Sequence, residues 1–202
     1  MKPAFVACAL AFTLTACGPI VQIGGNDKPP ESLLTLTATA VPAPARAVTN
    51  RADTIGVELP GVPATLQTLR LPVTVSPTEV RYLVGASWVE QPNRQFQRLL
   101  ADTISANGIA VIDIRQSSVA PQRRLTGSLL GFGLDVSNPG APVVRVRFDA
   151  QIANPRAPQT LMLRRFETTE PAFDQRPVTV AAALNRAANR VAGDVAVWAA
   201  TH

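Results

Sequence analysis

The chain has 202 residues, of which 47% are hydrophobic, and this suffices for one domain of ordinary size with a hydrophobic core. Its formal net charge is +5, and nearly all of the positive charge comes from arginine. The arginines are scattered and the chain has a single tyrosine, whereas nucleic-acid-binding proteins gather basic residues on one face with aromatic residues among them. The composition therefore argues against nucleic acid as a partner.

The N-terminus carries the signal of an exported lipoprotein. Lys2 precedes an apolar run, residues 3–16, that is shorter than the roughly 20 residues a bilayer-spanning helix requires. The run ends in Leu14-Thr15-Ala16-Cys17, which resembles the bacterial lipobox, where small residues precede a cysteine whose thiol receives a diacylglyceryl group. We expect residues 1–16 to be a lipoprotein signal peptide and Cys17 to carry the lipid anchor.

The residues around Cys17 indicate the destination and leave one alternative open. Gly18, rather than aspartate, follows the cysteine, and by resemblance to lipoproteins of bacteria with two membranes this favours the outer membrane. With two or three acyl chains attachment is effectively permanent, because each buried CH₂ contributes about 0.8 kcal/mol. Residues 17–31 are polar and rich in glycine and proline, so we expect a flexible tether. The alternative is a conventional cut at Ala7-Cys8-Ala9, although that site lies inside the apolar run.

Residues 32–202 are expected to form a single domain whose first part is mostly extended. Threonine alternates with Leu34, Leu36 and Ala38 in residues 32–40, which indicates a strand. A loop rich in proline and alanine follows in residues 41–51. Further strands are expected at residues 54–59, 69–75 and 80–88.

A helix is expected to begin near Pro92 and to end at Asn107-Gly108. Proline suits the first helical turn, and glycine accepts the left-handed conformation of a C-terminal cap. Between these ends, apolar residues recur at helical spacing on one face: Phe96, Leu99, Leu100 and Ile104. A buried strand is expected next, at residues 109–114.

The last part is expected to be an antiparallel meander followed by a helix. Residues 125–136 and 143–153 form a predicted hairpin around Asn138-Pro139-Gly140, and residues 160–168 add a third strand. One side of the middle strand is apolar, at Val144, Val146, Phe148, Ala150 and Ile152, which is typical of a strand buried on one side. The final helix is expected at residues 178–200, with an apolar stripe at Leu184, Ala188, Val191, Val195 and Trp198. The predicted fold class is therefore α+β, a mixed and mostly antiparallel β-sheet with two helices packed on one face.

The sequence is poor in histidine and cysteine, on which many enzymes depend. The only histidine is His202, so a Ser-His-Asp triad cannot form. Cys8 leaves with the signal peptide and Cys17 is lipidated, so the mature domain has neither a thiolate nucleophile nor the ligands of a zinc site. Paired carboxylates stay formally open, although acidic residues gather only at Glu167 and Glu170. We expect a protein that is not an enzyme, with no catalytic residues, no metal and no cofactor.

Trp88 and Glu90 are the candidate contacts for a partner. They stand just before Pro92, where the predicted strand meets the predicted helix. The favoured interpretation is that Trp88 fills the core at this junction and that Glu90 stabilises the positive start of the helix. The alternative is that one of the two side chains contacts a partner protein.

Three glycines in the predicted hairpin admit two interpretations. Gly127, Gly131 and Gly133 surround Phe132. Glycine within a strand usually marks a bulge or a close approach of two backbones, and we favour this interpretation. The alternative is that the missing side chains leave room for a lipid chain.

Several short motifs, taken in chain order, resemble a known family. They are Arg70-Leu71-Pro72-Val73, Tyr82-Leu83, Trp88-Val89-Glu90-Gln91-Pro92, Arg147-Phe148 and the alanine-rich C-terminal helix. Together with the lipobox, this order resembles the ABC-type transport auxiliary lipoproteins, the PqiC-like group, over residues 54–200. The Trp-x-Glu-x-Pro segment is the sharpest of these motifs, whereas residues 41–53 match nothing in the family pattern.

The resemblance implies a lipid-anchored protein of the outer membrane that faces the periplasm. Its implied partners are an MCE-domain protein and the associated ABC permease and ATPase, which move lipids between the two membranes. The auxiliary lipoprotein would dock this machine onto the outer membrane without hydrolysing ATP itself, and the sequence has no phosphate-binding P-loop motif. The sequence leaves open whether the protein forms a homo-oligomer. The alternative function is a lipoprotein that regulates a cell-wall synthase.

Overall fold

The computed structural model describes residues 32–41, 44, 54–154 and 157–201, and it describes no side chains at residues 157–160. The predicted signal peptide (1–16), the predicted tether (17–31) with Cys17, most of the predicted loop at residues 41–51, and His202 lie outside the described residues.

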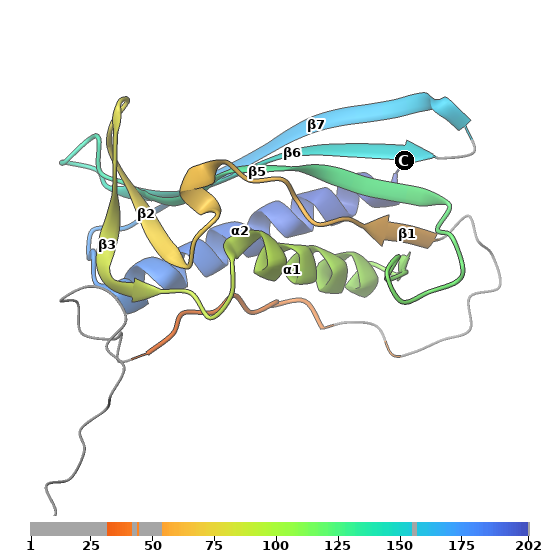
Figure 1. Cartoon of the computed structure of the whole chain (residues 1–202), viewed down its shortest axis with the longest axis horizontal. Coiled ribbons are helices and arrows are strands. Elements are labelled where there is room, and N and C mark those ends of the chain that lie inside the picture. Colours follow the sequence, from red (N-terminus) through yellow and green to blue (C-terminus); the bar gives the residue numbers. More distant parts are fainter. Residues whose placement is uncertain (1–31, 42–43, 45–53, 155–156, 202) are drawn as a thin grey trace, which may run out of the picture.

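In the described part of the chain, seven strands form one mixed sheet, and two α-helices pack on one of its faces (Figure 1). The strands are β1 (Thr54–Val57), β2 (Arg70–Ser76), β3 (Glu79–Ser87), β4 (Ala110–Val111), β5 (Arg123–Asp135), β6 (Val143–Asn154) and β7 (Ala157–Pro171). The helices are α1 (Pro92–Ala106) and α2 (Pro177–Ala200), and a 3₁₀ turn, η2 (Ala64–Leu66), precedes β2. This arrangement confirms the predicted α+β class.

The long strand β5 organises the sheet. Along one edge it pairs in parallel with β1, where Gly56 lies opposite Arg124, and with β2, where Val73 lies opposite Leu134. Along its other edge it pairs antiparallel with β6, which in turn pairs antiparallel with β7. The predicted meander is therefore confirmed, and its third strand is longer than the sequence indicated.

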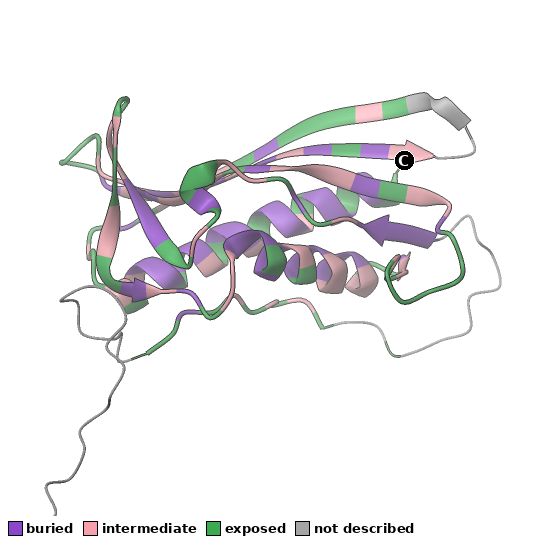
Figure 2. Cartoon of the chain, in the orientation of Figure 1, coloured by how far each residue is buried: buried purple, intermediate pink, exposed green. Residues whose placement is uncertain are grey.

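The core lies between the sheet and the two helices (Figure 2). Alternate residues of β6 from Val144 to Ile152 are buried, as their alternation predicts. Phe148 of β6 packs edge-on against Phe96 of α1, with ring centroids 5.4 Å apart. Phe166 of β7 packs in the same way on Trp198 of α2, at 5.6 Å. The predicted apolar stripes of both helices are buried in this core.

Both helices have close to the predicted bounds, for the predicted reasons. Pro92 is the first residue of α1, and Gly108, just beyond its end, has a φ of 84°, which favours glycine. Pro177 likewise begins α2. Within the described residues, neither helix is both long enough and apolar enough to cross a membrane.

The strand predicted at residues 109–114 is wrong in its extent. Only Ala110–Val111 form β4, paired in parallel with β1, and both residues are half-buried. Asp113 ends the extended run because it closes a turn. Its carboxylate accepts the backbone N–H of Arg115 at 2.9 Å, and its carbonyl accepts that of Ser117 at 2.9 Å.

Residues 32–40 are extended, as predicted, but they do not form a strand of the sheet. Leu34 makes a single parallel bridge with Trp88, and burial then alternates between apolar and threonine residues as the sequence indicated. The backbone groups beyond Leu34 bond instead to side chains of α1 and α2. Residues 34–39, which we call the strap, therefore run along the two helices on the side away from the sheet (Figure 1).

Candidate functional site

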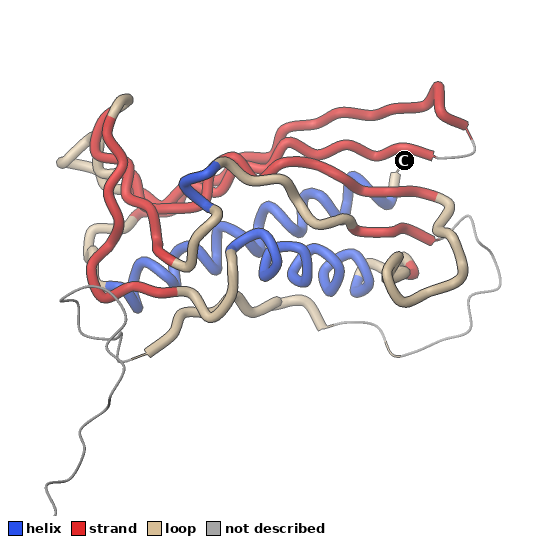
Figure 3. The backbone as a smooth tube through the Cα atoms, viewed as in Figure 1, coloured by secondary structure: helices blue, strands red, loops and turns tan. Residues whose placement is uncertain are grey.

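The helices leave one face of the β5–β6–β7 meander open. Because Phe148 and its alternate neighbours face the helices, Arg145, Arg147, Asp149 and Gln151 of β6 lie on the opposite face. Neither of the described α-helices lies on that side of the meander (Figure 3), and only at one end does η2 approach it, where Thr65 and Leu66 line a hollow with Asp135 and Arg145. We call this side of the meander the open face. It comprises these four residues of β6, Asp135 of the neighbouring strand β5, and three residues of the neighbouring strand β7: Leu163, Arg165 and Glu167.

Ion pairs connect the three strands across the open face. Arg145 of β6 donates to Asp135 at 3.2 Å and forms a shorter ion pair with Glu167. Arg165 of β7 donates two hydrogen bonds to Asp149, both 2.8 Å long. Exposed pairs of this kind contribute only about 0–1 kcal/mol each to stability. Their main effect is to present a fixed pattern of charges of both signs.

The pKa values of Asp135, Arg145, Asp149 and Arg165 are shifted so that their charges are retained. The hydrogen bonds from Arg165 hold the pKa of Asp149 below its ordinary value. Burial raises the pKa of Asp135, but hydrogen bonds from Ser137 and the adjacent Arg145 outweigh burial, so the net shift is downward. The hydrogen bond to Glu167 raises the pKa of Arg145.

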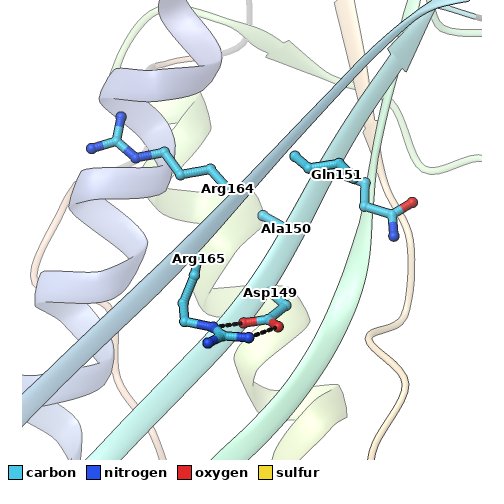
Figure 4. Close-up of a pocket in the computed structure, with 6 residues that line it drawn as sticks. Asp149, Ala150, Gln151, Arg164 and Arg165 are labelled. Carbon is cyan, nitrogen blue, oxygen red and sulfur yellow. Dashed lines mark hydrogen bonds and ion pairs between the residues drawn. The ribbon is translucent and has the colours of Figure 1, made fainter.

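A hollow of about 310 Å³ opens between β6 and β7. Its lining residues are Asp149, Ala150, Gln151, Leu163, Arg164 and Arg165. Figure 4 shows Asp149 and Arg165 turned toward one another, with Gln151 and Arg164 pointing away on opposite sides. Leu163 is 66% exposed beside the paired charges. An exposed apolar side chain next to satisfied charges suits contact with another macromolecule.

The carboxylate pair that the sequence left open is not formed. Glu167 pairs with Arg145 on the open face. Glu170 lies on the helix side, where its side chain is 13% exposed and pairs with Arg190 at 2.6 Å and with Arg186 at 3.7 Å. Among the described residues, no three metal-ligating side chains come together either.

The structure places Trp88 in the core and Glu90 at the surface of α1. Trp88 is 0% exposed, and its ring centroid lies 5.4 Å from that of Phe132. Its indole N–H has no hydrogen-bond partner among the described residues. Glu90 is half-buried and pairs with Arg98 at 2.5 Å. Burial of Trp88 supports the structural interpretation, and partner contact by either residue stays a prediction.

The three glycines stand where backbones and side chains crowd them. A Cβ atom at Gly133 would lie 2.5 Å from the carbonyl oxygen of Pro72 in β2, and one at Gly127 would clash with the Phe148 ring at 2.7 Å. At Gly131 a Cβ atom would lie 3.3 Å from that of Arg147. These neighbours support close approach rather than space for a lipid chain.

Three residues that were not among the predicted site residues connect the strap to the two helices. Gln95 of α1 and Asn185 and Asn189 of α2 bond to the backbone of the strap. A signal for the pair on α2 exists in the sequence, because two asparagines four residues apart are unusual in an alanine-rich helix and share one face. Their partner segment, about 150 residues away in the chain, has no such signal.

Solved structures show the same fold at low sequence identity. A crystal structure of a Xanthomonas campestris protein of the DUF330 family is 19% identical, with a TM-score of 0.71, and the match covers 83% of this chain and 94% of that chain. A second crystal structure, of an uncharacterized protein, is 12% identical with a TM-score of 0.63 and covers 83% of this chain and 99% of that chain. A PelC dodecamer from Paraburkholderia phytofirmans is 15% identical, covering 78% of this chain and 92% of that chain, but its TM-score of 0.42 is too low to support an argument about this chain.

No curated protein sequence matches the chain. A family model does: the one described as "ABC-type transport auxiliary lipoprotein component" matches residues 34–196. The matched range begins at the strap, contains every described strand and ends inside α2. The chain therefore belongs to the family of ABC-type transport auxiliary lipoprotein components.

Proposed function

We propose that this protein is a non-enzymatic lipoprotein of the outer membrane that faces the periplasm and docks an MCE-type ABC lipid-transport system onto that membrane. The observation that carries the proposal is membership of the auxiliary lipoprotein family. The lipobox ending at Cys17 and the glycine that follows it support the location. The open face supports docking, because it offers charged, polar and apolar groups together and neither described α-helix covers it.

Attachment by the N-terminus gives such a docking component its advantage. Acyl chains on Cys17 hold one end in the membrane, and residues 17–31, if fully extended, reach at most about 50 Å at roughly 3.4 Å per residue. A domain confined to this layer meets the distal end of an envelope-spanning partner at high effective concentration. A weak contact by the open face is then sufficient for docking.

Genetic interaction tests the transport role. Deletion of the gene is expected to weaken the outer-membrane barrier about as much as deletion of the MCE partner, with little further effect when both are deleted. Sensitivity to detergents and large antibiotics measures the barrier. Unrelated phenotypes of the two single deletions would contradict the proposal.

Site-specific crosslinking in the intact envelope tests the partner and the surface together. A photo-crosslinking residue in place of Gln151 on the open face is expected to capture an MCE-domain protein. The matched control is the same replacement at Asp194, which is exposed on α2. Capture of a cell-wall synthase from the open face, with no MCE protein, would replace this function by the regulatory alternative.

The anchor has its own test. Cys17→Ser is expected to give unprocessed or soluble protein, because the serine cannot receive the thioether-linked lipid. Fractionation of the envelope and intact-mass measurement of the mature protein detect the change. A wild-type mature protein that begins elsewhere and carries no lipid would contradict the prediction.

A further inference from the structure

The strap is held to the helices by side-chain amides that bond to its backbone. Asn185 accepts the N–H of Thr37 at 2.8 Å. Asn189 accepts the N–H of Thr39 at 2.8 Å and donates to the carbonyl of Thr37 at 2.9 Å. Gln95 of α1 accepts the N–H of Leu36 at 2.8 Å. We call Gln95, Asn185 and Asn189 the amide site.

The spacing of the two asparagines matches an extended peptide. Four residues of an α-helix rise by about 6 Å. Two residues of an extended chain advance by about 6.7 Å. Asn185 and Asn189 therefore meet Thr37 and Thr39 in the same order along parallel directions. A helix carrying asparagine at every fourth position can thus bond to alternate residues of an extended chain.

Two of the three amides also bond to a backbone carbonyl outside the strap. Asn189 also donates to the carbonyl of Asn185 at 2.8 Å, and Gln95 donates to the carbonyl of Glu90 at 2.7 Å. These bonds fix which end of each amide presents the oxygen to the strap. Gln95 is itself buried, so its oxygen needs this partner.

The side chains of the strap add apolar contacts and two hydroxyl hydrogen bonds, from Thr35 Oγ1 to Gln95 Oε1 at 3.2 Å and from Thr39 Oγ1 to Asn189 Oδ1 at 3.0 Å. Leu34 is 7% exposed and enters the core beside Trp88, while Leu36 and Ala38 are half-buried against the core. The threonines between them are exposed. The contacts thus require an extended backbone with apolar residues at alternate positions, and serine in place of the threonines between them would keep the hydroxyl donors.

We propose that the amide site is a binding site for an extended peptide segment, recognised through its backbone, and that residues 34–39 are its intramolecular ligand. The strap is the first described segment after Cys17, and, resting on the proposed lipid anchor, force on that anchor would reach α1 and α2 at this site before it reaches β1. The binding claim does not depend on the transport role.

A nicked chain tests whether the site binds the strap without the covalent link. The protein is the full mature-length chain with Cys17→Ser, so that a shared micelle cannot retain the fragment. A protease recognition sequence is placed within residues 45–53 and cleaved. Cleavage gives an N-terminal fragment that contains the strap and a C-terminal fragment that contains the sheet and both helices, which we call the body. The N-terminal fragment is expected to stay with the body during gel filtration at micromolar concentration. Its release from a body that keeps its circular dichroism spectrum would overturn the proposal.

Variants assign the retention to the amides. Asn185→Ala with Asn189→Ala removes the partners of three backbone groups of the strap and is expected to weaken retention of the fragment at least about tenfold. The matched control is Gln151→Ala, an amide removed from the open face, which should retain the fragment like wild type. Equal retention by the double variant and the control would show that Leu34 and Gln95 suffice to hold the strap and would overturn recognition by the two asparagines.

Peptide competition keeps the test independent of the folding of any variant. A synthetic peptide of residues 32–41 is expected to displace the labelled fragment from the nicked wild-type body. The same peptide with N-methyl groups on the backbone nitrogens of Thr37 and Thr39 keeps every side chain but loses two donors, so it should compete at least about tenfold less well. A peptide with serine at positions 35, 37 and 39 should compete as well as the parent. Equal competition by the N-methylated peptide would overturn backbone recognition.

Discussion

The two faces of the β5–β6–β7 meander come from alternate residues of the same strands, yet they differ in almost every physical respect. On the helix side, Val146 and Phe148 are buried and packed against α1 and α2. On the open face, Arg147 and Asp149 alternate with them and remain in contact with water. The pleat of a strand with a period of two thus separates a layer that holds the fold from a layer that is free to bind.

The difference between the two faces predicts which substitutions lower stability and which act on a partner. Burial of apolar area contributes about 25 cal/mol per Å², whereas an exposed ion pair contributes at most about 1 kcal/mol. Changes on the helix side should therefore lower the free energy of unfolding. Changes on the open face should leave unfolding nearly unchanged and should act on a partner.

Trp88→Ala is expected to have the largest effect. The side chain is fully buried against Phe132, so its removal should cost about 3–5 kcal/mol of unfolding free energy. Urea unfolding of the Cys17→Ser chain measures this loss. Val84→Ala, at a position 87% exposed, is the control and should change the free energy by less than about 0.5 kcal/mol. Unchanged unfolding of the Trp88 variant together with lost crosslinking would establish partner contact instead.

Gly133→Ala is expected to be the next most damaging change. The new Cβ atom would lie 2.5 Å from the carbonyl oxygen of Pro72, so β2 and β5 must separate, at a cost of about 1–3 kcal/mol. Gly193→Ala is the matched control, because a Cβ atom there meets nothing within 4 Å. In the interior of α2 this second change should stabilise by up to about 1 kcal/mol. Equal unfolding midpoints for the two variants would contradict the close approach.

The sequence predicted those parts of the fold that depend on local pattern. Pro92, Gly108 and the apolar residues between them were enough for α1, and alternation was enough for β6 and its buried face. Local pattern failed where a distant partner decides the outcome. Residues 32–40 have the alternation of a strand, but their backbone partners are Gln95, Asn185 and Asn189 on helices, which no pattern within the segment can reveal.

The candidate site was less predictable than the fold for a related reason. Alternation predicted which side of β6 is apolar, but the pairing of the charged residues between these positions depends on the register with β5 and β7. Arg145 lies between Asp135 and Glu167 only in that register. Likewise Glu167 and Glu170, three residues apart, lie on opposite faces, so the register excludes the carboxylate pair that the sequence had left formally open at these two residues.

Arg165→Ala tests the expectation that a change on the open face affects partner contact and leaves stability nearly unchanged. The variant loses both hydrogen bonds to Asp149, yet the pair is exposed, so unfolding should change by less than about 1 kcal/mol. Crosslinking through a photo-reactive residue at position 151 should fall. Arg165→Lys keeps the charge but not the two parallel hydrogen bonds, so an intermediate yield is expected. A loss of stability as large as that of Trp88→Ala would remove the distinction between the two faces.

The smallest expected effect is the titration of Asp174, which lies beyond the meander at the start of α2. Hydrogen bonds from the side chain and the backbone N–H of Arg176 lower the pKa of this carboxyl from 3.8 to about 2, and Thr179 donates a further bond. Because the pKa is lower in the folded state, the carboxylate contributes stability that is complete above its ordinary pKa and is lost as the pH falls from about 4 toward 2. No pH dependence from this group is expected at neutral pH. Arg176→Ala should raise the midpoint toward 3.8, measured by carboxyl NMR, while the open-face crosslink stays as in wild type. A wild-type midpoint already near 3.8 would show that these hydrogen bonds do not persist in solution, and the start of α2 would then behave like the rest of the exposed surface.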